Sequence, residues 1–296
     1  MKYVLIGFVL SILIFCSEAN KTSAQVLETN SIVEFDKTNH NKYSWKANTT
    51  FENKLINRIA VPKGYKRITL VKNSNADWLR NIQLKPGNPE VYLFNGEKKV
   101  NQTAQFAVLD IDVGTKDLQQ CADAVMRLRA EYLFSIKKYD DIHFKFTSGD
   151  DCSFNAWAKG FRPVLNGNHV SFVKKAAEDY TYSSFKSYLE IIFSYCGTFS
   201  LSKELKVVNQ LNDLKAGDVF IMGGFPGHAV TVMDVAENIE TKAKIFLLSQ
   251  SYMPAQDIHI LKNLTNKDLS PWFSINFGEN LETPEWTFQP NTLRSF

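Results

Sequence analysis

The chain has 296 residues, 13% of them aromatic, and it carries 34 Lys and Arg against 31 Asp and Glu, a formal net charge of +3. This small, scattered basic excess excludes a polybasic nucleic-acid-binding protein, so we expect no nucleic acid among its partners. The length and composition are typical of a packed globular protein with one large domain and an extension.

Residues 1–24 are interpreted as a secretory signal peptide. Lys2 supplies the positive end, the apolar run YVLIGFVLSILIF follows, and Ala24 ends the small-residue stretch TSA. The run is short for a membrane-spanning helix. We therefore expect export to the periplasm or cell surface, with no membrane segment left after cleavage. Lipidation at Cys16 is the less favoured alternative, because Phe15 is bulky where a small residue is expected.

The chain beyond the signal peptide is expected to form a flexible arm followed by one domain. Residues 25–50 are polar and show no sustained periodicity, which is typical of a loosely packed arm. Residues 51–296 are expected to form a single α+β domain. Near its start, VYLFNGEKKV predicts a hairpin around its NGE turn, and QFAVLDIDV at 105–113 predicts a strand.

The middle of the chain predicts two long helices. The first follows Asp117, which would cap it, with Gln120 three residues later in a capping-box pattern. The alternating segment 141–149 predicts a strand with Ile142, Phe144 and Phe146 facing inwards. A second helix is expected from about residue 182 to Cys196, ended by Gly197.

The last third of the chain predicts an antiparallel sheet. Three strands are expected in succession at 216–222, 228–235 and 244–251, and 257–261 is a candidate fourth strand. The short connections favour antiparallel pairing. Because the helices precede this sheet, the order of elements is that of an α+β fold.

Three residues are candidates for a nucleophilic site. Cys121 lies near the start of the first long helix, where the helix dipole favours a thiolate, so we expect its pKa to lie below the ordinary value of about 8.5. His228 begins a strand and would act as the base. Gln250 ends the next strand and would lie beside His228 to orient its ring. The competing interpretation makes Cys121 a core residue and His228 a turn histidine.

The remaining cysteines and histidines are less suited to catalysis. After signal cleavage the chain keeps Cys121, Cys152 and Cys196. Cys152 and Cys196 could form a disulfide, which would leave Cys121 as the free thiol, but sequence does not fix the pairing. His143 and His259 are expected on outward strand positions. We find no spacing typical of a metal site and no phosphate-binding motif, so no cofactor is expected.

Several sequence blocks resemble known protein families. LDIDVGTKDLQQCADAVMRLRAEYL, AGDVFIMGGFPGHAVTVMDVAEN and LLSQSYMPAQDIHIL resemble a family of secreted bacterial proteins known only as a domain of unknown function, over about residues 60–290. QQCADAV and the histidine strand are more remotely similar to CHAP and NlpC-type papain-like cysteine hydrolases. That resemblance implies a papain-like core and gives Cys121, His228 and Gln250 the roles of nucleophile, base and orienting residue.

The resemblance implies a secreted cysteine amidase or peptidase acting on peptidoglycan peptides. The Cys121 backbone N–H and Gln120 would then stabilise the oxyanion. The alternative is a non-catalytic envelope protein that binds glycan or peptide in the same cleft through Trp157, Trp272 and Trp286. A third possibility is a structural surface protein without a cleft.

Overall fold

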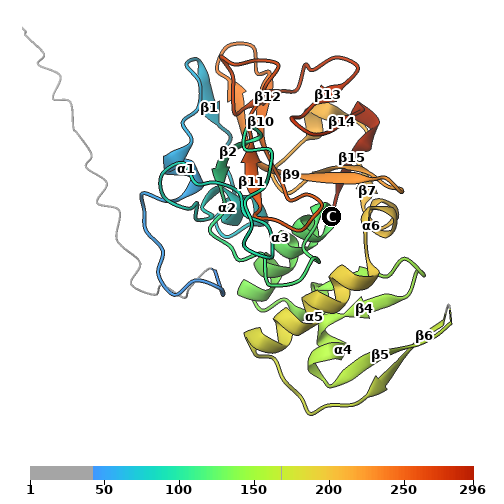
Figure 1. Ribbon diagram of the computed structural model, residues 1–296. Coiled ribbons are helices and arrows are strands. Elements are labelled where there is room, and N and C mark those ends of the chain that lie inside the picture. The colour runs from blue at the N-terminus through green and yellow to red at the C-terminus, as the bar shows by residue number, and fades with distance from the viewer. Residues whose placement is uncertain (1–42, 168) are drawn as a thin grey trace, which may run out of the picture. The chain divides into compact units, whose positions relative to one another are not determined.

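The computed structural model describes residues 43–167 and 169–296 (Figure 1). The expected signal peptide and residues 25–42 of the expected arm lie outside these residues. Residues 43–50 were also assigned to the arm, but Tyr43 is buried and donates its hydroxyl to the backbone oxygen of Trp78 at 2.9 Å. The packed part of the chain therefore begins before residue 51.

Helices and strands alternate irregularly along the chain. The helices are α1 (Leu55–Arg58), α2 (Asn75–Arg80), α3 (Cys121–Ser135), α4 (Phe154–Ala158), α5 (Tyr182–Tyr195) and α6 (Thr198–Glu204). The strands up to residue 207 are β1 (Tyr65–Arg67), β2 (Gln105–Val108), β3 (His143–Lys145), β4 (Asp151–Ser153), β5 (Phe161–Asn166), β6 (His169–Lys174) and β7 (Lys206–Val207). The later strands are β8 (Val219–Met222), β9 (His228–Asn238), β10 (Lys244–Gln250), β11 (His259–Leu261), β12 (Phe273–Ser274), β13 (Leu281–Glu282), β14 (Thr287–Phe288) and β15 (Leu293–Ser295).

One large antiparallel sheet organises the described residues. Its strand order is β2-β11-β10-β9-β8-β15-β7, with β1 also paired to β9 and β12 to β10. The four strands expected in the last third of the chain are present as β8 to β11, and each pairs antiparallel with the next. The expectation of a mixed α+β fold with an antiparallel sheet is confirmed.

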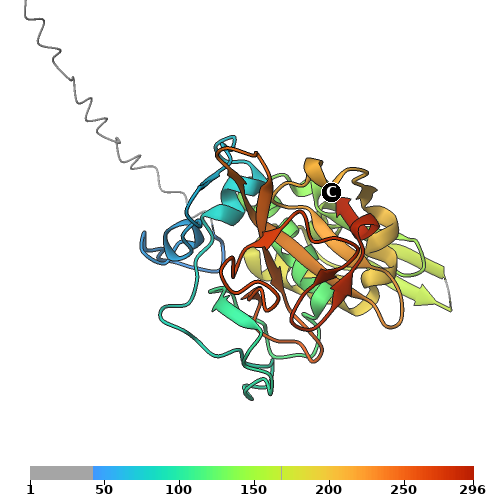
Figure 2. The same cartoon turned by 90° about the horizontal axis from the view of Figure 1, so that it is seen from above.

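Strand β9 is the centre of the molecule because its two faces belong to different parts of the core. Ala229 and Met233 pack with α3, while Val230 and Val232 pack with the C-terminal strands. Every residue from His228 to Ala236 is therefore buried. Figure 1 shows α3 between this sheet and α5. Both views place the β5–β6 hairpin on the opposite side of the molecule from α1 and β1 (Figure 2).

Helix α3 begins three residues later than the sequence predicts. Asp117 does not cap it, because its Oδ1 accepts hydrogen bonds from the Ala255 backbone N–H and from Gln120 Nε2. Gln120 is the N-cap residue instead, and its backbone N–H donates to Asp123 Oδ2 at 3.0 Å. Cys121 is therefore the first helical residue.

The strand predicted within 141–149 is present as β3, and the second long helix is present as α5. Ile142, Phe144 and Phe146 are buried around β3, and α5 ends at Tyr195, just before its C-cap Cys196. The sequence did not reveal α6, which begins immediately after Gly197. Among the described residues, no helix combines the length and the apolar character that a membrane span requires.

Candidate functional site

Cys121 lines a cavity of about 290 Å³ at the start of α3. The cavity also borders the end of α5, the start of α6 and the turn between β8 and β9. Its walls are formed by Asp117, Leu118, Gln120, Cys121, Ala122, Asp123, Phe193, Cys196, Gly197, Thr198, Gly224, Phe225, Pro226, Gly227 and Met253. Because Cys121 is the first residue of the helix, its backbone N–H has no backbone carbonyl partner within the helix.

The glycine-rich turn before His228 is shaped by close contact with α6. A Cβ at Gly223 would lie 2.1 Å from Ser202 Oγ, and a Cβ at Gly227 would lie 2.3 Å from Thr198 Oγ1. Thr198 Oγ1 also donates a hydrogen bond to the Gly224 carbonyl at 3.2 Å. A larger residue would clash at these positions. The turn therefore packs closely against α6, and this contact determines where β9 begins.

His228 and Gln250 lie together, as the sequence predicts. Strands β9 and β10 pair antiparallel with Ser249 opposite Thr231, which brings the end of β10 beside the start of β9. His228 Nε2 lies 2.9 Å from Gln250 Oε1. Both side chains are buried. Their adjacency is confirmed, and the Gln250 amide holds the imidazole from the side opposite Nδ1.

Three further polar residues, which sequence analysis missed, extend this pair. Gln250 Nε2 donates to Glu285 Oε2 at 2.6 Å, and the same oxygen accepts from Lys99 Nζ at 2.5 Å. Asn101 Nδ2 donates to Glu285 Oε1 at 3.0 Å. Burial acts to raise the pKa of Glu285, but the hydrogen bond and charge of Lys99 outweigh it and hold this pKa below its ordinary value.

His259 belongs to the same cluster, which corrects its expected outward position. It is fully buried, because β11 lies between β10 and β2 and both faces of the strand are covered. Its Nε2 lies 3.4 Å from Gln250 Nε2, and its Nδ1 lies 2.9 Å from the Asp257 carbonyl oxygen. His143, the other histidine expected to face outwards, is exposed.

Cys121 is adjacent to this cluster, although no hydrogen bond joins its sulfur to His228 within the residues described. The Ala229 backbone N–H, one residue after His228, donates towards the sulfur, as do the N–H groups of Ala122 and Cys121 itself. Tyr252 is near both: its ring lies 5.0 Å from that of His228, and burial, followed by Glu285 and Cys121, raises the pKa of Tyr252.

The protonation states differ from those expected from the helix dipole. Burial, followed by the charge of Asp123, raises the pKa of Cys121 to about 11. Burial lowers the pKa of His228 to about 4, against the opposing effect of the Gln250 hydrogen bond. The expectation of a lowered Cys121 pKa was wrong, because desolvation and an adjacent carboxyl group outweigh the helix dipole. At neutral pH the resting site holds a neutral thiol and a neutral imidazole.

Cys152 and Cys196 do not form the disulfide that the sequence allowed. All three described cysteines are free thiols. Burial raises the pKa of Cys152 to about 12, and burial also raises that of Cys196, with the neighbouring Cys152 as the next cause. Cys196 lines the same cavity as Cys121 and provides a natural comparison for it.

The tryptophans expected to bind glycan are mostly inaccessible. Trp157 and Trp272 are buried in the core. Trp286 is half-buried, and its ring lies 5.3 Å from that of His228. Among the residues that the structure describes, no group of three or more acidic, histidine or cysteine side chains is placed to hold a metal ion.

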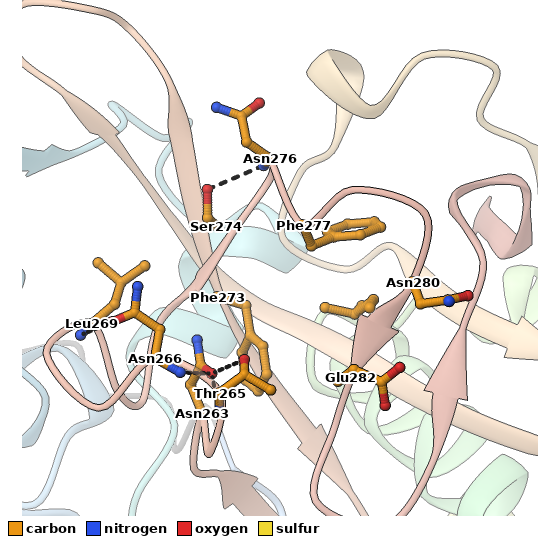
Figure 3. Close-up of a pocket in the computed structure, with 11 residues that line it drawn as sticks. Asn263, Thr265, Asn266, Leu269, Phe273, Ser274, Asn276, Phe277, Asn280 and Glu282 are labelled. Atoms are coloured by element: carbon orange, nitrogen blue, oxygen red, sulfur yellow. Dashed lines mark hydrogen bonds between the residues drawn. The ribbon is translucent and has the colours of Figure 1, made fainter.

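A second cavity, of about 280 Å³, lies near the other end of β10 (Figure 3). It is near β12, whose Ser274 pairs with Ile245. The side chains of Asn266, Asn276 and Asn280 point in different directions in Figure 3 and do not converge on one point. Its lining includes no cysteine or histidine. The cavity at Cys121 is therefore the stronger candidate for chemistry.

Comparison with known proteins identifies a family but no activity. Residues 55–295 match the family model described as "Domain of unknown function (4846)". No curated protein matches the chain significantly. No solved structure matches it significantly either.

Proposed function

The chain belongs to the family matched over residues 55–295, and for this member we propose a secreted cysteine amidase or peptidase that cleaves cell-wall peptides. Cys121 is the nucleophile, His228 the general base and acid, and Gln250 the residue that orients His228. One observation carries the proposal: His228 contacts Gln250 at 2.9 Å, and the next residue, Ala229, donates its backbone N–H towards the sulfur of a cysteine at a helix N-terminus.

A papain-like core and a remote kinship to CHAP and NlpC-type hydrolases are part of this proposal. Two features support them. A helix that begins with cysteine packs against an antiparallel sheet, and that sheet carries the histidine and the amide on adjacent strands. The order of the three residues along the chain also matches the order that the resemblance implies.

The proposed reaction begins from the neutral pair. His228 Nδ1 removes the proton from Cys121 Sγ, and the thiolate attacks the substrate carbonyl carbon. The Cys121 backbone N–H and the remaining Gln120 Nε2–H stabilise the oxyanion. When the C–N bond breaks, the leaving amine takes the proton from His228. Water, deprotonated by His228, then attacks the thioester, the acid is released, and the proton returns to the thiol. For the first step, Cys121 Sγ must turn from the Ala229 N–H towards Nδ1.

The lining of the cavity indicates which part of a substrate it accepts. No Lys or Arg lines the cavity, and its two acidic residues are Asp117 and Asp123. Phe225 and Met253 are 86% and 68% exposed at its edge, which is unusual for large apolar side chains. We propose that an uncharged, apolar segment of the peptide lies next to the cleaved amide, while acidic groups of a wall peptide remain outside.

A non-catalytic binding protein is the second candidate function. It is favoured by the raised pKa of Cys121, which leaves the thiol protonated at neutral pH. In that case the same cavity would bind a peptide, with Phe225 and Met253 as contacts. Trp157 and Trp272 would not take part, because both are buried.

Digestion of purified cell-wall stem peptides tests the enzyme proposal. The mature protein is expected to release one new amine and one new carboxylate for each amide that is cleaved, as measured by mass spectrometry. Cleavage is expected to favour amides beside apolar residues. Binding of intact peptide without any cleaved product would favour the non-catalytic candidate.

A further inference from the structure

We infer that Glu285 is a positioning residue that sets the tautomer of His228 through Gln250, so that Nδ1 faces the reaction as a proton acceptor. The catalytic role of Glu285 rests on the proposed function. The tautomer of His228 follows only from the hydrogen bonds of Gln250, His228, His259 and Glu285.

Glu285 determines which way the Gln250 amide points. An ionised carboxylate only accepts hydrogen bonds. Glu285 Oε2 lies 2.6 Å from one end of the Gln250 amide, so that end must be the NH₂ group. The reversed amide would place its oxygen against the carboxylate and leave the buried NH₂ group facing His228 Nε2. The carbonyl oxygen therefore faces His228.

The orientation of Gln250 in turn fixes the proton on His228. Gln250 Oε1 can only accept, so His228 Nε2 carries the hydrogen and donates it across 2.9 Å. A neutral imidazole has one N–H and one acceptor nitrogen. Nδ1 is therefore the acceptor, and no hydrogen bond from the described residues occupies it. This is the tautomer that a base needs to remove a proton from Cys121.

His259 supports the same assignment independently. Its Nδ1 lies 2.9 Å from the Asp257 carbonyl, which accepts only, so Nδ1 carries the hydrogen. Its Nε2 is then an acceptor and can receive the second N–H of Gln250 across 3.4 Å. Both hydrogens of the Gln250 amide are thereby used, one by Glu285 and one by His259. The two buried histidines hold opposite tautomers.

Lys99 and Asn101 keep Glu285 charged and in place. The Lys99 and Glu285 side chains are 8% and 13% exposed and form an ion pair at 2.5 Å. Asn101 donates to the other carboxylate oxygen. Removing only one member of such a pair would leave a buried charge without a partner. The informative variant therefore replaces both charges together.

The test measures tautomers directly, by two-dimensional ¹H–¹⁵N NMR of protein labelled at its five histidines. His228 is assigned by its loss in the His228→Ala spectrum. In the unsubstituted protein we expect His228 protonated at Nε2 and His259 at Nδ1. Lys99→Met/Glu285→Met is expected to give His228 as a mixture of both tautomers. Glu285→Gln keeps an oxygen acceptor and is expected to retain the Nε2–H form.

Lys66→Met/Glu237→Met is the matched control, because this ion pair lies at the opposite end of β9 from His228. It is expected to leave both tautomers unchanged.

In the peptide assay, Lys99→Met/Glu285→Met should lower kcat on the order of tenfold with little change in KM, because a wrongly protonated base affects the chemical step.

Two results would overturn the positioning role. One is a His228 protonated at Nδ1 in the unsubstituted protein, a measurement that remains possible even if the double variant fails to fold. The other is a double variant that folds and keeps the Nε2–H form. If the tautomers change as expected while no peptide is cleaved by any variant, the proposed enzyme activity fails and the positioning of the imidazole stands.

Discussion

Replacing Cys121 by serine is expected to lower the rate of peptide hydrolysis about a thousandfold or more. A serine hydroxyl is far harder to deprotonate than a thiol, and the neutral His228 imidazole is the proposed base for the thiol proton. The exchange removes little volume, and Cys121 is partly exposed at the first position of α3, so the fold should be retained. Initial rates of product formation, compared at equal protein concentration, measure the effect.

Cys196→Ser is the matched control for this substitution. Cys196 lines the same cavity and is also a free thiol of intermediate exposure, but it caps the C-terminal end of α5. It is expected to keep hydrolysis within about twofold, since substitutions that leave the reacting groups in place change transition-state stabilisation little. Equal losses in the two variants would show that the cavity is disturbed in general and would remove the special role of Cys121.

A loss, between pH 6.5 and pH 4, of the stability that two buried histidines contribute is the second large effect expected. Burial lowers the pKa of both His228 and His259 to about 4, from 6.5 in the unfolded chain. Between these values the two histidines bind more protons in the unfolded chain than in the folded chain, so their contribution to the free energy of unfolding falls as the pH drops. Buried acids with a raised pKa, such as Asp123 and Glu131, act in the opposite direction. Each histidine contributes up to about 3 kcal/mol to this fall.

Urea unfolding at a series of pH values measures this effect. His259→Gln removes one of the two buried histidines, so the change in the free energy of unfolding from pH 6.5 to pH 4 is expected to differ from that of the unsubstituted protein by up to about 3 kcal/mol, in the direction of a smaller loss. His143→Gln is the control for the loss of a histidine at the surface, because His143 is exposed at β3. An unchanged slope in His259→Gln would contradict the buried, neutral state of that residue.

The sequence was informative where local patterns decide the structure. A glycine-rich turn followed by a mostly apolar strand placed His228 at the start of β9, and the short β9–β10 connection brought Gln250 beside it. The glycines are explained by a tertiary contact that no local pattern shows, because Gly223 and Gly227 lie against α6. Helix α6 itself was missed.

The sequence was uninformative where distant segments meet. Lys99 and Glu285 are 186 residues apart in the chain and meet only because the C-terminal segment returns to the sheet. His259 was expected outside because alternation assumes one solvent-facing side, whereas β11 is covered on both faces. The pKa of Cys121 was expected to be low from its helix position alone, but burial and Asp123 determine it.

Labelling with a peptide chloromethyl ketone, built on the acyl part of a cleaved wall peptide, tests most directly whether Cys121 and His228 act as a pair. The bound peptide presents an electrophilic carbon to the nucleophile, and digestion with mass spectrometry locates the modified residue. We expect a single adduct on Cys121, formed much more slowly in His228→Ala, with Cys196 unmodified. An adduct on Cys196 in place of Cys121, or labelling of Cys121 at the same rate in His228→Ala, would contradict the proposed site.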